Sequence, residues 1–302
     1  YSLLDGSNKI KEYVARVKEL GMDSAAITDH GVMYGVIDFY RAAKAAGINP
    51  VLGCEIYVAP GSRFDREAGN AKESRYHRLV LLAENDIGYA NLVKIVSRGF
   101  TEGFYYKPRV DKELLEKYHE GIIALSACLA GEVARNVTRG LYEDAKKAAL
   151  SYEKIFGKGN FFLELQDHGI SAQATVNQAL LRMSEETGIE LVATNDIHYI
   201  NAEDAEPHDV LLCIQTGKKV NDENRMRYTG QEFFKSPDEM AALFPDDLEA
   251  LENTMEIADK VEHYTLEHKP LMPDFPLPDD FVIDQAELRR IFLRRFDGQI
   301  SG

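Results

Sequence analysis

The sequence is poor in cysteine and has no tryptophan. Its three cysteines, Cys54, Cys128 and Cys213, are widely spaced, which excludes a disulfide framework and a CxxC zinc knuckle. No apolar run is long enough to span a bilayer, and no signal-peptide pattern is present. We therefore expect a protein of the reducing cytoplasm that does not act in a membrane.

Positive charge is also scarce. The chain has 35 basic and 50 acidic residues and a net charge of −15. This excludes nucleic-acid binding by bulk electrostatics, because phosphate contact needs local positive charge. Any nucleic-acid role must then work through metals, a local basic patch or another part of a larger protein.

The 302 residues, 45% of them hydrophobic, can bury the core of one large α/β domain or of two smaller ones. Apolar runs of strand length alternate with segments of helical spacing. The expected strands are 25–28, 50–58, 77–83, 121–127, 161–165 and 191–194. The expected helices are 8–20, 36–46, 87–97, 143–156, 172–187, 237–243 and 248–261. Such alternation is typical of a parallel sheet or a barrel.

Two domains are expected. Residues 1–270 form the α/β domain, and residues 271–302 form a connector toward a further region. Four prolines near its start, Pro270, Pro273, Pro276 and Pro278, indicate a stiff, extended segment. The chain begins at Tyr1, without a methionine, and we expect it to be the interior of a longer sequence.

Ionisable residues follow two of the expected strands. Ile27-Thr28-Asp29-His30-Gly31 ends the first strand, and Thr194-Asn195-Asp196-Ile197-His198 ends the last. The carboxyl ends of parallel strands are where α/β folds place their ligands. Asp196 and His198 are two residues apart, so on a regular strand they point to the same side. This pattern predicts a metal site.

Seven side chains at or beside strand ends are candidate metal ligands. They are Asp5, His30, Glu55, His77, Cys128, Asp196 and His198. The mixed nitrogen and oxygen set suits Zn²⁺, Mn²⁺ or Fe. Two or three such ions close together would hydrolyse a phosphoester.

Each candidate also has a plainer interpretation. Asp5 before Gly6 can be a turn residue, His30 can cap a strand by hydrogen bonding, and Cys128 can be a small core residue. His77 comes at the beginning of a strand, which departs from the barrel rule. Glu55 is harder to explain away, because a buried carboxylate needs a cation or another partner.

Other polar residues leave two interpretations open. Glu164, Asp167 and His168 follow a strand, and we expect them to support the ligands or to lie on the surface. Tyr105-Tyr106-Lys107-Pro108-Arg109 could meet a nucleotide strand or form an ordinary exposed loop. The same holds for the basic residues of the polar loop 59–76, which are Arg63, Lys72 and Arg75.

Several motifs together resemble a known family. They are Tyr1-Ser-Leu-Leu-Asp-Gly6, Ile27-Thr-Asp-His-Gly31, Gly53-Cys-Glu-Ile-Tyr-Val58, His77-Arg-Leu-Val-Leu-Leu-Ala83, Gly103-Phe-Tyr-Tyr-Lys-Pro-Arg109, Ala193-Thr-Asn-Asp-Ile-His198 and Leu271-Met-Pro-Asp-Phe-Pro-Leu-Pro278. The chain resembles the PHP (polymerase and histidinol phosphatase) domain, and more closely the PHP domains of bacterial replicative DNA polymerase III alpha subunits. The resemblance covers residues 1 to 278.

The resemblance implies a distorted, seven-stranded (β/α) barrel of the TIM type, with its first strand lost or truncated before Tyr1. It implies a cluster of Zn, Mn or Mg ions at one mouth, held by the seven candidates. Two further histidine ligands are expected in a His-x-His motif upstream, so the cluster here is expected to be incomplete. The resemblance also places Asp29 beside the ligands, where it would orient its neighbours, and Lys107 and Arg109 near the substrate.

Three functions follow from the resemblance. The first is a metal-dependent phosphoesterase, of the 3′–5′ exonuclease type, within a DNA-directed DNA polymerase of DNA replication. The second is a catalytically silent scaffold that stabilises the polymerase body and binds a proofreading subunit and other replisome proteins. The third is a stand-alone phosphatase for a small molecule. The fragment itself is not expected to polymerise DNA, because nothing after residue 278 supplies the polymerase carboxylates.

Overall fold

The computed structural model describes residues 1–66, 75–274, 276 and 284–296. The chain divides into two compact units, Tyr1–Thr265 and Leu266–Gly302. The division falls at Thr265 and not at residue 270. In the second unit, residues 266–274 have no regular structure and α11 spans Gln285–Phe296. Pro278 and Lys72 lie outside the described residues.

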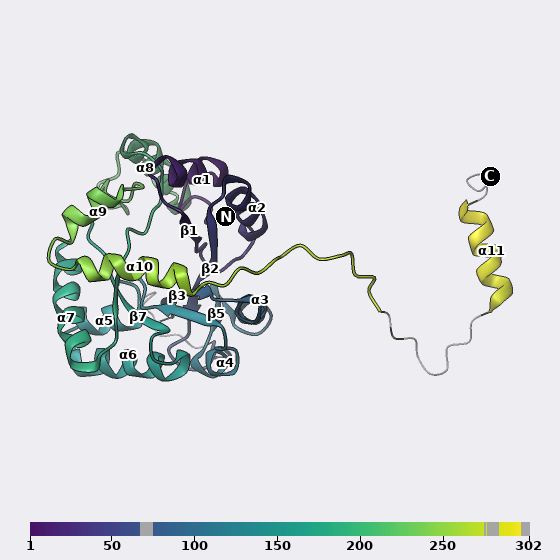
Figure 1. Ribbon diagram of the computed structural model, residues 1–302, viewed down its shortest axis with the longest axis horizontal. Helices are drawn as coiled ribbons and strands as arrows, with labels where there is room; N and C mark the ends of the chain where they lie inside the picture. Colours follow the sequence, from purple (N-terminus) through teal and green to yellow (C-terminus); the bar gives the residue numbers. More distant parts are fainter. Residues whose placement is uncertain (67–74, 275, 277–283, 297–302) are drawn as a thin grey trace. The chain divides into compact units, whose positions relative to one another are not determined.

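The described residues of the first unit form eight strands. Helices cover these strands (Figure 1). In chain order its elements are α1 (Ile10–Glu19), β1 (Ser24–Ile27), α2 (Val36–Ala46), β2 (Asn49–Val58), β3 (His77–Ala83), α3 (Asp86–Thr101), β4 (Phe104–Tyr105), β5 (Lys107–Val110), α4 (Lys112–Lys117), β6 (Ile122–Leu125), α5 (Glu132–Thr138), α6 (Tyr142–Phe156), β7 (Phe161–Leu165), α7 (Ser171–Thr187), β8 (Leu191–Ala193), the 3₁₀ helix η2 (Ala202–Asp204), α8 (Ala205–Thr216), α9 (Pro237–Leu243) and α10 (Leu248–Lys260).

The sheet is mostly parallel, but two strands, β3 and the two-residue β4, are reversed. The strands follow the order β4-β5-β2-β3-β6-β7-β8, and β1 pairs with β2. β3 is antiparallel to both β2 and β6, whereas β1–β2, β2–β5, β6–β7 and β7–β8 are parallel. The alternation of strands and helices indicated a parallel sheet or a barrel, and the parallel order is interrupted at β3. As a result, β3 begins at the edge of the sheet where its neighbours end.

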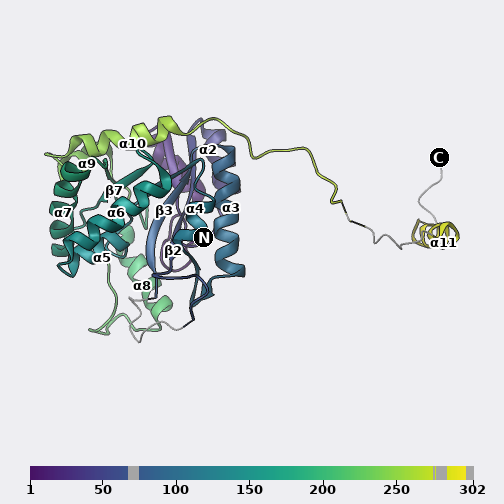
Figure 2. The ribbon, with the colours of Figure 1, turned by 90° about the horizontal axis from the view of Figure 1, so that it is seen from below.

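The sheet is curled, as expected for a distorted TIM-like barrel (Figure 2). The segment before α1 lies between the two ends of the sheet. On one side Ser7 donates its N–H to the carbonyl of His198, at 2.8 Å. On the other side the Ser2 N–H and hydroxyl donate to Asp29, at 2.9 and 2.8 Å. Residues 2–8 thus bridge the gap between β8 and β1.

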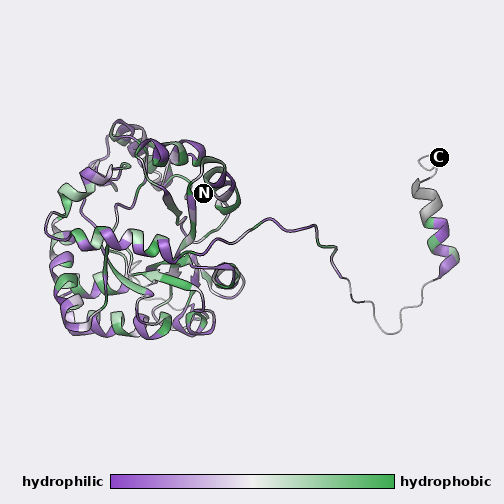
Figure 3. Ribbon diagram, viewed as in Figure 1, coloured by the Kyte–Doolittle hydropathy of each residue, from purple (hydrophilic) through white to green (hydrophobic). Residues whose placement is uncertain are grey.

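Alternating side chains of the strands build two cores. Leu79 and Leu81 of β3 face the outer layer of helices, together with Ile56 of β2. Val80 and Leu82 face the barrel interior. Figure 3 shows hydrophobic residues concentrated on the strands and polar residues on the outward parts of the helices. This two-sided burial fixes which β3 side chains can reach the interior.

α10 closes one end of the barrel. Its Ile257, together with Val261 just after its end, packs into the interior core, and α10 lies against β8. The ionisable strand ends are therefore left at the other end. Among the residues that the structure describes, none of the helices is long and apolar enough to cross a membrane.

Candidate active site at the barrel mouth

The open mouth contains a cavity of about 310 Å³. The ends of β1, β2 and β8 and the segment before α1 contribute side chains to it. Among the lining residues are Asp5, His30, Glu55, Glu164, Asp196 and His198. The structure thus brings five of the seven candidate ligands to one cavity, with Glu164 beside them.

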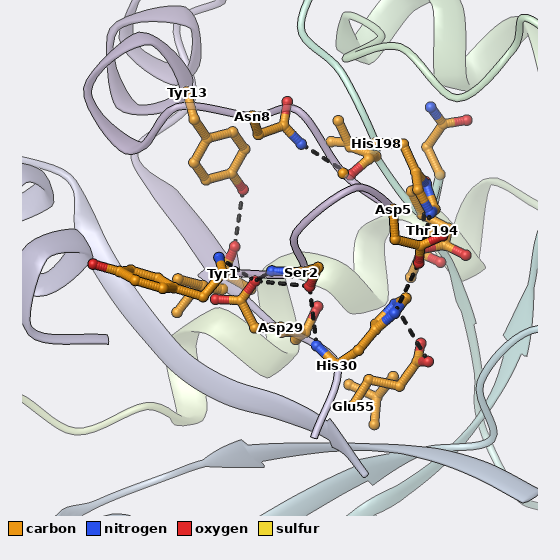
Figure 4. A pocket seen from close by; sticks show the side chains of 18 of the residues that line it. Tyr1, Ser2, Asp5, Asn8, Tyr13, Asp29, His30, Glu55, Thr194 and His198 are labelled. Carbon is orange, nitrogen blue, oxygen red and sulfur yellow. Dashed lines mark hydrogen bonds and ion pairs between the residues drawn. The ribbon is translucent and has the colours of Figure 1, made fainter. Parts of the chain in front are cut away.

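His30 lies between two carboxylates (Figure 4). Its Nδ1 is 2.9 Å from Oδ2 of Asp5, and its Nε2 is 3.5 Å from Oε1 of Glu55. The parallel pairing of β1 with β2 continues past Ile27, since the N–H of Glu55 donates to the carbonyl of Asp29. This continuation holds His30 next to Glu55. Glu55 itself is 5% exposed.

His198 lies just after β8 and also approaches the carboxylate of Asp5. Its Nδ1 is 2.7 Å from the carbonyl oxygen of Asp196, and its Nε2 is 3.8 Å from Oδ2 of Asp5. Asp196 has a positive φ of 45°, a conformation that non-glycine residues rarely adopt and that clusters at functional sites. The turn at Asp196 allows the imidazole to bond to the backbone two residues earlier.

Two residues of the site come from the region after β8 and were not predicted from the sequence. The Tyr228 hydroxyl donates to Oδ1 of Asp5 at 3.3 Å and lies 3.0 Å from Nε2 of His198. His208 of α8 is buried, and its Nε2 is 2.6 Å from the carbonyl oxygen of Asp5. Tyr228 carries no sequence signal, because it lies in a long irregular segment far along the chain from its partners.

Arg78 is the third residue that was not predicted. Its Nη1 lies 2.9 Å from Oε1 of Glu55. The sequence signal was present: residues 78, 80 and 82 of β3 alternate with the outward-facing 77, 79 and 81. To use this alternation, one must know which of the two sets of side chains faces the barrel interior.

His77 is not brought to the cavity. It precedes Arg78 on β3 and pairs with Val58, whose side chain belongs to the outer core. Its Nδ1 is buried without a hydrogen-bond partner. Burial lowers the pKa of His77 to about 4, and the nearby charge of Glu132 opposes this only in part. His77 therefore faces the α5 side of the sheet.

Cys128 follows β6 and is half-buried. Burial raises the pKa of its thiol to about 12, and the charges of Glu55 and Asp196 act in the same direction. The thiol thus lies within electrostatic reach of both carboxylates, but it is not among the residues that line the cavity.

Asp29 supports His30 through hydrogen bonds to Ser2. One of its oxygens accepts hydrogen bonds from the N–H and the hydroxyl of Ser2. The Ser2 hydroxyl in turn accepts the N–H of His30 at 3.0 Å. Asp29 therefore acts on His30 through Ser2, and its second oxygen is buried without a partner.

Glu164 and its neighbours form a second polar group in the cavity. Oε1 of Glu164 accepts from the Thr194 hydroxyl and, at 3.1 Å, from the Gln166 amide. Its Oε2 is buried without a partner. His168 is also buried, but its Nε2 contacts the carbonyl of Asn195, at 2.8 Å. Asp167 accepts the N–H of Gly169.

The basic residues predicted to meet a substrate lie apart from the cavity. Arg109 is buried at 2% exposure and donates to the backbone carbonyls of Gly103, Arg75 and Asp65. It holds the loop before β3 and is not open to a nucleotide strand in this arrangement. Lys107 is exposed, with its Nζ 5.4 Å from the centre of the Tyr57 ring.

Two other arginines also take part in local structure. Arg63 forms ion pairs with Glu102 and Asp111, at 2.7 and 2.9 Å. The guanidinium of Arg75 stacks on Tyr106, 3.9 Å from the ring centre. Both therefore have partners within the protein.

A model of the family described as the PHP domain matches residues 1–168 of the chain. The chain belongs to the PHP domain family. The resemblance drawn from the motifs is confirmed, and the curled α/β sheet is the fold expected for this PHP domain.

Relatives of this PHP domain extend the similarity over nearly the whole chain. DNA polymerase III subunit alpha of Borreliella burgdorferi is 46% identical over 283 residues, which is 93% of this chain and 24% of that protein. The same subunit of Treponema pallidum is 41% identical, over 97% of this chain and 25% of that protein. The Thermus aquaticus subunit is 41% identical, over 100% of this chain and 26% of that protein. The chain thus spans about a quarter of the length of these relatives.

Among solved structures, a candidate metal-dependent phosphoesterase from Bifidobacterium adolescentis is 14% identical. It has a TM-score of 0.42 and covers 64% of this chain and 84% of that chain.

The charges of the PHP mouth compensate one another. Burial lowers the pKa of His198, but the carboxylates of Asp5 and Asp196 outweigh it and raise the pKa to about 9. Burial raises the pKa of Asp5, whereas His198 and His30 lower it well below its usual range. Burial also raises the pKa of Glu55, and His30 and Arg78 act against it. Without a metal, His198 is therefore positively charged at neutral pH.

Divalent metal binding is what the PHP family implies, and the donors fit it on one side of the cavity. As they lie, no three His, Cys, Asp or Glu side chains in the described part of the chain form a group that could hold a metal ion. On the Asp5 side, however, a carboxylate and two imidazoles converge. His198 also bonds a backbone carbonyl through Nδ1, the usual support of a metal-binding histidine.

Proposed function

We propose that this chain is the PHP module of a bacterial replicative DNA polymerase III alpha subunit, acting in DNA replication in the cytoplasm. We further propose that its mouth hydrolyses phosphodiester bonds at DNA 3′ ends with a divalent metal. The convergence of Asp5, His30 and His198 at one cavity carries this proposal. The identity to polymerase subunits over nearly the whole chain supports the setting. Polymerisation and the contacts with DNA, the polymerase body, a proofreading subunit and other replisome proteins would belong to the whole subunit.

Asp5, His30 and His198, with Asp196 beside them, would hold the ion. A bound divalent cation would neutralise phosphate oxygens and lower the pKa of water. Its binding would need both imidazoles neutral, because a histidine ligand must be neutral, so the proton of His198 would be displaced. The metal would be Zn²⁺ or Mn²⁺, which accept nitrogen and oxygen donors together.

Tyr228 is suited to supply a proton in the reaction. In 3′–5′ hydrolysis, the oxygen of a water attacks phosphorus, the bond to the preceding 3′ oxygen breaks, and that oxygen takes up a proton. Burial raises the pKa of Tyr228, as do the charges of Asp5 and Asp196, so its hydroxyl stays protonated. It already contacts Asp5 and His198. A positioned general acid contributes about 10²–10⁴-fold to a rate, most when its pKa lies near the operating pH, so the raised pKa of Tyr228 places it at the lower end.

The test combines metal analysis with a nuclease assay on single-stranded DNA labelled at its 5′ end, in Mn²⁺ or Zn²⁺. We expect bound metal, release of mononucleotides from the 3′ end, and loss of both in Asp5→Asn. Tyr228→Phe keeps the ring and should keep the metal while losing activity about 100-fold. Val220→Ala, an exposed substitution in the same segment, is the matched control. Absence of bound metal in the wild-type chain would contradict the proposal.

A second function, the catalytically silent scaffold, is favoured by a specific observation. The contacts of Asp5, His30, Glu55, Arg78 and His198 link the segment before α1 to β2, β3 and the ends of β1 and β8 without any metal. If this is the role, His30→Ala lowers the unfolding midpoint and no metal-dependent nuclease is found. Robust metal-dependent cleavage that His30→Ala abolishes would argue against it.

A further inference from the structure

We propose that the guanidinium of Arg78 takes the place of one metal ion in this PHP barrel. The mouth then accepts a single divalent ion on the Asp5 and His198 side, and none against Glu55. This inference rests on the proposed function, because it concerns how many ions that site binds.

The strand geometry puts Arg78, and not His77, at the mouth. β2 and β3 pair Glu55 with Val80 and Tyr57 with Arg78. Val80 belongs to the interior core and Leu79 to the outer one. Neighbouring residues of a strand point to opposite faces, so an inward Arg78 forces His77 outward. One possible imidazole ligand is thereby directed away from the cavity, and a cation is brought against Glu55, which lines the cavity.

Glu55 forms an ion pair with Arg78, and the geometry of this contact does not make a hydrogen bond to its Oε1. Oε1 of Glu55 lies 2.9 Å from Nη1 of Arg78 and 3.5 Å from Nε2 of His30. The carboxylate side chain is only 6% exposed. A buried carboxylate needs a positive partner, and Arg78 provides one without a metal.

The surroundings of Arg78 favour a fixed positive charge. Burial lowers the pKa of its guanidinium, but the carboxylate charges of Glu55 and Asp196 outweigh this effect and raise it. Both carboxylates are candidate ligands, one from β2 and one from the segment after β8. An arginine cannot lose its proton in a protein, so a divalent ion placed against Glu55 would meet a permanent like charge. The Asp5 side differs, because the described residues there offer a carboxylate and two imidazoles and no arginine.

The test counts ions by elemental analysis of the 302-residue chain after equilibration with Mn²⁺ or Zn²⁺ and removal of free metal. We expect one ion per chain in the wild type and in Arg78→Lys, which keeps the charge. We expect two in Arg78→His, because it removes the fixed charge and adds a ligand. The double variant Arg78→His with Glu55→Gln should return to one, which would locate the extra ion at Glu55. The control is Arg182→Gln, which removes an exposed arginine of α7 that pairs with Glu186.

Circular dichroism and the unfolding midpoint show whether each variant is folded. If Arg78→His does not fold, Arg78→Gln decides the question in the same way, because it also removes the like charge. Two ions in the wild type, or a folded charge-free variant that gains none, would overturn the inference. A wild type without metal, combined with an added ion in Arg78→His, would support the role of Arg78 and contradict the proposed phosphoesterase.

Discussion

Glu164 is a carboxylic acid in a site that already holds several carboxylates. It is 6% exposed, with one oxygen bonded to Thr194 and Gln166 and the other without a partner. Burial raises the pKa of Glu164 to about 7, and the charges of Asp196 and Glu55 add to this, while the Thr194 hydrogen bond opposes it. At neutral pH this residue is therefore close to its titration point in the folded protein.

The raised pKa of Glu164 predicts a pH-dependent effect of Glu164→Gln. The folded protein binds this proton more tightly than the unfolded chain does, so the contribution to stability is complete below about pH 4. It is lost as the pH rises through 7. The glutamine is neutral at every pH, so we expect the variant to gain about 2–3 kcal/mol relative to the wild type between pH 5 and pH 8.

Urea unfolding of both proteins at the two pH values measures this difference. The control is Glu190→Gln, an exposed position just before β8, which should change stability by less than about 0.5 kcal/mol. An equal difference between wild type and Glu164→Gln at pH 5 and pH 8 would contradict the prediction.

His77 and Arg78 show why the sequence predicted several residues of the cavity and its surroundings but not all of them. Asp5, His30, Glu55, Asp196 and His198 were predicted together, because ionisable residues at strand ends indicate a shared edge. Whether residue 77 or 78 faces inward depends on the register between β2 and β3, which a single strand does not reveal. Tyr228 could not be predicted at all, because only the folded chain brings it to Asp5.

At the scale of elements, α10 covers the end of the barrel opposite the site. Its buried Ile257 packs with Val80, Leu82, Ile123 and Phe162 from three strands. Without this helix, the inward side chains of those strands would be exposed to water at the end opposite the site. By covering this end, α10 stabilises the same strands whose other ends carry the candidate ligands.

Ile257→Ala should accordingly destabilise the protein. Removing a buried isoleucine side chain and leaving a cavity costs about 2–5 kcal/mol. Met255→Ala on the same helix is the control, because Met255 is 46% exposed and should cost less than about 0.5 kcal/mol. Guanidinium unfolding curves of the two variants test this. Similar midpoints for both would show that α10 does not seal the interior.

Most elements were predictable because they are long and strongly patterned. The predicted helix at 36–46 and the strands at 77–83 and 161–165 coincide with α2, β3 and β7. The hairpin of β4 and β5 was missed because its strands have two and four residues and one contains Pro108. The direction of β3 was missed because alternation along the chain does not encode direction.

At the scale of the molecule, both hydrophobic cores of the described residues lie within the first unit. Just after α10, Val261 joins the interior core and Tyr264 packs against it. The Glu262 N–H donates to the carbonyl of Glu84 at 2.8 Å, and the rings of Tyr264 and Tyr89 lie 6.2 Å apart. The residues that follow α10 up to Thr265 therefore belong to the barrel.

A pair of truncations tests where the folded unit ends. A chain ending at Thr265 keeps Val261 and Tyr264, and we expect its free energy of unfolding to match that of the 302-residue chain within about 0.5 kcal/mol. A chain ending at Lys260 loses the buried Val261 side chain and uncovers part of the interior. Burial of a valine is worth about 1.5–3 kcal/mol, so its stability should fall by at least that amount. Urea unfolding of the three chains measures both differences. If the chain ending at Thr265 were as weak as the one ending at Lys260, the barrel would also need residues beyond 265, and the unit boundary would have to move toward the predicted residue 270.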